Sequence, residues 1–143
     1  MIRTLRSSTL AAVAAVAFAA VLQAQAPGGH THAHAHAAPY GGEVVEAAGH
    51  HVEFKVDPSG ALWVWLLDAQ EKPIAPVAGG RVTLIPEGPE GEQVTLPLQV
   101  DSANQRLATQ FEATKLKAFE AVVSLPIEGK RHNFRFHYPR PHH

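Results

Sequence analysis

Apolar and polar residues alternate in short runs along the chain from residue 40 onward. A period of two indicates β-strands with one buried face, because successive side chains of a strand point to opposite faces. The pattern predicts strands at residues 44–45, 50–56, 61–67, 81–85, 93–100, 106–111, 119–127 and 131–138. The run 61–67 is apolar on both faces, which is typical of a central strand.

Turn residues separate these runs. Asp57-Pro58-Ser59-Gly60 has the composition of a tight turn, and residues 128–130 are expected to form a hairpin turn. Pro97 indicates that the run 93–100 lies at a sheet edge. Residues 113–118 are compatible with a single helical turn, but no segment shows a sustained helical period. Seven or eight short strands in about 100 residues predict an all-β fold, an immunoglobulin-like antiparallel β-sandwich, with a small closed barrel as the alternative.

The N-terminal segment has a different character. Arg3 and Arg6 precede an uncharged apolar run, Leu10–Leu22, which spans 13 residues. A membrane-spanning helix needs about 20 apolar residues. A basic start, a short apolar middle and the small-residue site Ala24-Gln25-Ala26 predict a secretory signal peptide at residues 1–26, and hence a periplasmic or secreted protein. An uncleaved anchor is the alternative.

A histidine tract follows the predicted signal peptide. Residues 27–39 consist of Gly, Pro, Ala, Thr and His, which bury too little apolar surface to offset the entropy of ordering, so the tract is predicted to be disordered. His30, His32, His34 and His36 occupy alternate positions. In an extended chain their side chains point the same way about 6.5–7 Å apart at Cα, so neighbouring imidazoles can share a cation and four suit a tetrahedral zinc site. The alternative is a solvated tail with incidental metal affinity.

Composition narrows the function. The chain has 143 residues, room for one folded domain (40–143), and its formal charge of −1 offers no basic surface for nucleic acid. It has no cysteine, and its one methionine, Met1, belongs to the predicted signal peptide, so the mature chain is expected to lack sulfur ligands for Cu(I). Zn(II) or Cu(II) is therefore the preferred metal, with Ni(II) or Co(II) also compatible. No phosphate loop, nucleophile elbow or recognisable carboxylate pair is present, so we do not expect an enzyme.

Histidines also occur in the predicted domain. His50 and His51 begin a strand and should face opposite sides of the sheet. His132 is in phase with the aromatic residues of the last strand and is expected at the rim of the core, whereas His137 lies on the polar face. Each of these histidines alone is most simply a surface or rim residue. Trp63 and Trp65 share one face of their strand, as core residues or, alternatively, as an exposed platform.

Three segments carry a resemblance to known proteins. They are Pro39-Tyr40-Gly41-Gly42-Glu43-Val44-Val45, His50-His51-Val52-Glu53-Phe54, and Leu62–Asp68 followed by Lys72-Pro73. This region resembles small exported proteins and efflux-adaptor extensions that accompany heavy-metal efflux and copper-resistance systems in the bacterial periplasm, with the pattern P-H-G-G-x-V, G-x-x-H-x-E and V-x-L-x-D-x-x-x-x-P. The resemblance implies a transition-metal role and makes His51 and Glu53 candidate ligands. Tyr40 replaces the histidine of that pattern, so that role is lost here or passes to a tail histidine such as His36.

The sequence therefore predicts a periplasmic transition-metal-binding protein, a buffer or carrier near an efflux system, with no stable membrane anchor after processing. Its partners are expected to be the metal ion and an efflux-system or other envelope protein. The alternative is a metal-independent module that binds another envelope protein. The candidate ligands are His30, His32, His34, His36, His50, His51, Glu53 and His137.

Overall fold

The computed structural model describes residues 38–89 and 91–139. The predicted signal peptide and the four tract histidines lie outside these residues. Within them, no helix has the length and apolar character that a membrane crossing requires. The described elements are β1 (Glu43–Ala47), β2 (His50–Val56), β3 (Ala61–Leu67), β4 (Arg81–Pro86), β5 (Val94–Pro97), β6 (Gln99–Asp101), the 3₁₀-helix η1 (Ser102–Asn104), β7 (Arg106–Gln110), β8 (Phe119–Ile127) and β9 (Lys130–Tyr138).

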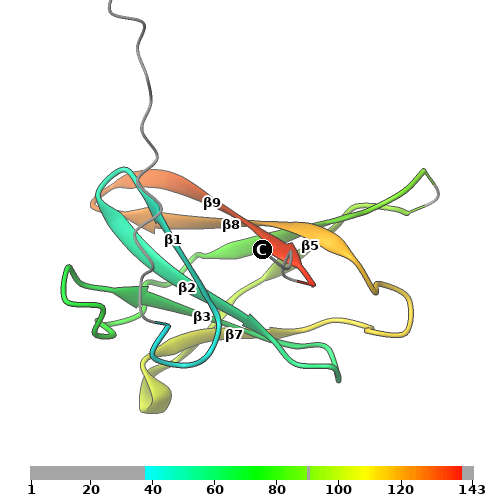
Figure 1. The fold of residues 1–143 in the computed structure, drawn as a ribbon. Helices are drawn as coiled ribbons and strands as arrows, with labels where there is room; N and C mark the ends of the chain where they lie inside the picture. Colours follow the sequence, from blue (N-terminus) through cyan, green and yellow to red (C-terminus); the bar gives the residue numbers. More distant parts are fainter. Residues whose placement is uncertain (1–37, 90, 140–143) are drawn as a thin grey trace, which may run out of the picture. The chain divides into compact units, whose positions relative to one another are not determined.

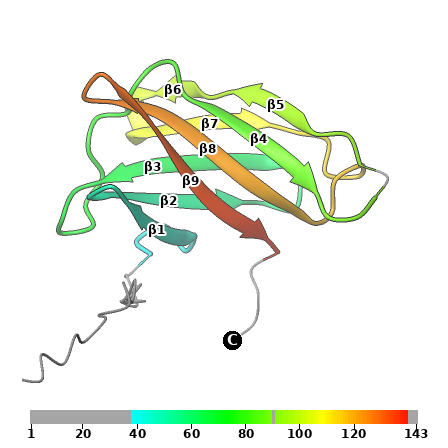
Figure 2. The same cartoon turned by 90° about the horizontal axis from the view of Figure 1, so that it is seen from above.

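These strands form two antiparallel sheets, which confirms the all-β prediction. Sheet A has five strands in the order β1-β2-β3-β7-β6, and sheet B has four in the order β5-β4-β8-β9. The sheets lie in two layers, with β2, β3 and β7 on one side and β8 and β9 on the other (Figures 1 and 2). No strand ladder among the described residues joins the sheets, so the closed-barrel alternative is not what forms.

Short turns set the register of the hairpins. The β1–β2 turn has Ala48 and Gly49, both with positive φ, which is the backbone that a two-residue type I′ hairpin requires. This turn places Glu46 opposite His51. At the predicted Asp57–Gly60 turn, the Gly60 amide donates to the Asp57 carbonyl at 2.9 Å. The predicted turns therefore join β2 to β3 and β8 to β9.

The predicted strand 93–100 forms differently from the expectation. It divides at Leu98 into β5, which pairs with β4 in sheet B, and β6, which pairs with β7 in sheet A. Pro97 has no N–H to continue a ladder, and the Leu98 amide donates to the Gly80 carbonyl at 2.9 Å instead. The same segment thus belongs to both sheets. Residues 113–118, considered as a helical turn, form only a non-helical turn.

The core lies between the sheets and is built from one face of each strand. The inward residues include Val52 and Phe54 of β2, and the Phe54 ring stacks on Phe136 of β9 with centroids 4.7 Å apart. On β3 the inward residues are Leu62, Val64 and Leu66. Trp63 and Trp65 consequently lie on the outer face of sheet A, which corrects the expectation that they fill the core between the sheets.

Candidate functional site

Strand β2 carries three of the four candidate ligands of the domain, His50, His51 and Glu53, and places them on two faces. Val52 and Phe54 pack into the core, so His50 faces inward with them. His51 and Glu53 alternate with these residues and therefore face outward on sheet A. The three candidate ligands of β2 therefore form two groups: His51 and Glu53 on the outer face, and His50 on the inner face.

Glu53 is fully buried although it lies on the outer face, because the segment before β1 covers it. Its Oε1 accepts hydrogen bonds from the Gly42 amide at 2.7 Å and the Tyr40 amide at 3.1 Å. A Cβ at residue 42 would lie 2.4 Å from the Phe54 carbonyl oxygen, so only glycine allows this approach. The Glu53 carboxylate therefore fastens the N-terminal segment to the sheet.

Tyr40 completes this cover. Its ring stacks on Trp65 with centroids 4.3 Å apart and planes 3° apart, which leaves Trp65 only 3% exposed. The Lys55 Nζ donates to the Tyr40 carbonyl at 2.8 Å. The Tyr40 ring thus shields an aromatic side chain of the outer face.

His51 is held in a defined orientation. Its Nδ1 lies 3.2 Å from the Asp68 carbonyl oxygen, and its Nε2 lies 3.4 Å from Oε2 of Glu46. A carbonyl oxygen can only accept, so Nδ1 carries a hydrogen and a neutral imidazole presents its lone pair at Nε2. Two acceptors, the Nε2 and the carboxylate oxygen, then face each other, and a proton or a metal cation between them relieves their repulsion.

The 3.4 Å separation fits two ligands of one metal ion. Zinc binds imidazole nitrogen and carboxylate oxygen at about 2.0–2.2 Å, so neighbouring ligands of a tetrahedral ion lie about 3.3–3.6 Å apart. A histidine whose Nδ1 donates to a backbone carbonyl is the usual form of a metal-binding imidazole. The His51 side chain is 15% exposed and that of Glu46 is 49% exposed, so an ion can reach the pair from solvent.

The other domain histidines lie elsewhere. His50 meets His132 of β9 at the rim of the core, with ring centroids 4.9 Å apart. His137 lies on the outer face of sheet B, where its Nε2 is 4.0 Å from Oε2 of Glu120. His51 and His137 thus lie on opposite faces of the sandwich. No group of three or more metal-ligating side chains occurs within residues 38–89 and 91–139.

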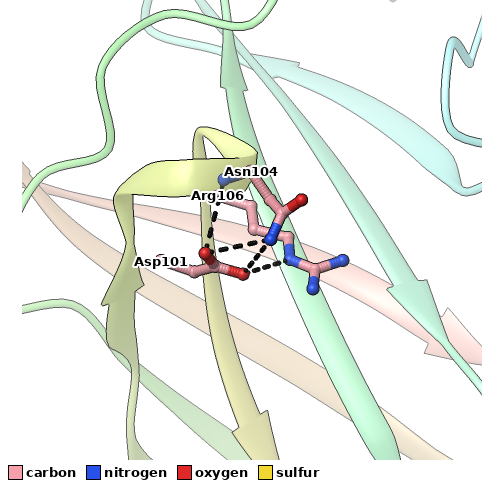
Figure 3. Close-up of polar contacts among 3 residues, drawn as sticks. All are labelled: Asp101, Asn104 and Arg106. Atoms are coloured by element: carbon pink, nitrogen blue, oxygen red, sulfur yellow. Dashed lines mark hydrogen bonds and ion pairs between the residues drawn. The ribbon is translucent and has the colours of Figure 1, made fainter.

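A polar cluster of Asp101, Asn104 and Arg106 lies at the β6–β7 hairpin (Figure 3). The Arg106 guanidinium lies 5.2 Å from the centroid of the Trp63 ring, and its Nε donates to Asp101 Oδ2 at 2.9 Å. Asn104 donates to the same carboxylate through both its backbone N–H and its side-chain Nδ2. The hydrogen bonds from Asn104 and then from Arg106 lower the pKa of Asp101 below its ordinary value of 3.8. The cluster closes the β6–β7 hairpin.

Glu46 is the residue that the sequence reasoning missed. Its signal was the pair Ala48-Gly49 between two alternating runs, since a two-residue turn pairs residue 46 with residue 51. A carboxylate placed directly opposite a histidine in a hairpin is a candidate ligand pair.

Comparison with known proteins gives no relative: no family model, no curated protein and no solved structure matches this chain.

Proposed function

We propose that this protein binds a divalent transition metal, Zn(II) or Cu(II), and acts as a metal buffer or carrier in the periplasm. In this proposal the tract histidines His30, His32, His34 and His36 capture the metal, and His51 and Glu46 supply two ligands of a site in the domain. The observation that carries the proposal is the 3.4 Å contact between Nε2 of His51 and Oε2 of Glu46. Glu53 is left out because its carboxylate already accepts two backbone amides.

We also propose that the sandwich is of the immunoglobulin-like type. The order β2-β3-β7-β6 facing β5-β4-β8-β9 corresponds to strands A-B-E-D facing C′-C-F-G, with β1 as an added strand. The chain crosses from β5 in sheet B to β6 in sheet A, as it does in the C′–D connection of that fold. The export signal read from residues 1–26 supports a periplasmic location.

Titration calorimetry with Zn(II) and Cu(II) on the full chain tests the metal proposal. We expect His51→Gln and Glu46→Gln each to weaken binding about tenfold or more, since each removes one ligand from a shared ion. Replacement of all four tract histidines by Asn should weaken it further. His137→Gln is the matched control, because that histidine also neighbours a carboxylate but lies on sheet B. Unchanged affinity in His51→Gln and Glu46→Gln, or no binding by the wild type, would overturn the proposal.

The metal-independent interaction module stays the competing function. A complex with an envelope protein that forms equally in the presence of a chelator and with the tract histidines replaced would favour it.

A further inference from the structure

The rim of the core near the β1–β2 turn carries a pair of imidazoles, those of His50 and His132. His50 belongs to β2 of sheet A, and His132 belongs to β9 of sheet B. Their rings meet between the two sheets with centroids 4.9 Å apart and an interplanar angle of 60°. Both side chains are half-buried. We propose that His50 and His132 form a separate transition-metal site that links the two sheets.

The ring geometry supports shared coordination. A metal ion about 2.0–2.1 Å from an imidazole nitrogen lies about 3.2 Å from the ring centroid. Two imidazoles on one ion therefore have centroids about 4.5 Å apart for ligands at 90° and about 5.2 Å apart for tetrahedral ligands. The separation of 4.9 Å lies between these values, so the spacing of the two rings is that of two imidazoles on one ion.

The surroundings leave the imidazole nitrogens available. In the part of the chain that the structure describes, neither ring takes part in a hydrogen bond or ion pair, and the two rings contact each other. His50 lies opposite Ala47 in the hairpin, and His132 lies opposite the fully buried Leu125. An apolar floor therefore lies on the core side, and water can fill the remaining coordination positions from the solvent side. Imidazole donors without sulfur or carboxylate suit Cu(II), Ni(II) or Zn(II).

A cross-sheet site has a consequence that the tract does not share. His50 and His132 are distant in sequence and meet only in the folded protein, so an ion bound to both raises the stability of the fold. Histidines at alternate positions of one short segment are equally close in the unfolded chain. A metal bound by the tract alone therefore stabilises the folded state much less. This site does not depend on His51 or Glu46, so it can be present whether or not the proposed function holds.

Thermal unfolding of the full chain, followed by circular dichroism, tests this site. Titration with Ni(II) or Zn(II), with a chelator as reference, should raise the midpoint by about 10 °C at a free metal concentration about 100 times the dissociation constant. In a chain that carries His51→Gln, which removes the other proposed domain site, His132→Gln and His50→Gln should each abolish most of that rise, whereas His137→Gln on the outer face of β9 should retain it. A full rise in both His132→Gln and His50→Gln would overturn the proposal.

A spectroscopic measurement covers the case in which either variant loses metal-free stability. A chain in which the four tract histidines are Asn and His51 is Gln should still bind one Cu(II), with an electron paramagnetic resonance spectrum of two nitrogen ligands. Adding His132→Gln should remove that spectrum. If it persists, the site is not formed by this pair. The calorimetric effect of His51→Gln reports separately on the proposed function.

Discussion

Removal of the Glu53 carboxylate is the sharpest test of how the N-terminal segment is held. Glu53→Ala deletes the acceptor of the Gly42 amide at 2.7 Å and the Tyr40 amide at 3.1 Å. Each donor that loses its partner beneath the cover costs about 1–3 kcal/mol, so the pair costs about 2–6 kcal/mol. A domain of this size has a free energy of unfolding of about 5–15 kcal/mol, so the loss is a large fraction of the total. We expect the midpoint of thermal unfolding to fall by about 10 °C or more.

Urea unfolding monitored by tryptophan fluorescence measures this loss directly, because Trp65 lies under the segment that Glu53 holds. Glu120→Ala is the control: its carboxylate pairs with Arg135 on the exposed face of sheet B, where ion pairs contribute about 0–1 kcal/mol. A loss below about 1 kcal/mol in Glu53→Ala, equal to that of the control, would show that the two amide hydrogen bonds do not fasten the segment.

Two further predictions concern the outer face of sheet A. Tyr40→Ala should shift tryptophan emission to longer wavelength, because Trp65 loses its stacked partner. The lost stacking should lower the free energy of unfolding by about 0.5–1.5 kcal/mol, in addition to the loss from the apolar area that is no longer buried. Tyr40→Phe keeps the ring and should keep the emission of the wild type. Asp101→Asn should destabilise the fold at neutral pH and not at strongly acid pH. The hydrogen bonds from Asn104 and Arg106 lower the folded-state pKa of Asp101, so its stabilisation is complete above the ordinary value of 3.8 and is lost as pH falls through the lower folded value. Equal wild-type and Asp101→Asn stabilities in urea at neutral pH would contradict this.

Local chemistry made much of the fold predictable. The strands 50–56, 61–67 and 119–127 were predicted with the bounds that the structure shows, because their apolar alternation and their flanking turn residues agree. The strand 93–100 was predicted as one element because its alternation is continuous in sequence. Which sheet each half joins depends on the partners β4 and β7, which no local pattern contains.

The candidate site divides in the same way. That His50 and His51 face opposite sides follows from the period of a strand, and the tract spacing is visible in the sequence alone. The surroundings of each side chain follow neither from the strand period nor from the spacing of the tract histidines. Trp65 lies outside the inter-sheet core, yet it is buried because Tyr40, far away in sequence, stacks on it.

The sequence by itself determined the β-rich pattern, the histidine tract and the absence of cysteine, since these depend on residue identity and spacing along the chain. Only the tertiary structure decided that Glu53 accepts backbone amides, that Glu46 faces His51, and that His50 meets His132 across the sheets. The physical reason is that ligation and hydrogen bonding act over about 2–3.5 Å, and pairs so close in space are set by strand register and sheet packing rather than by neighbours in sequence.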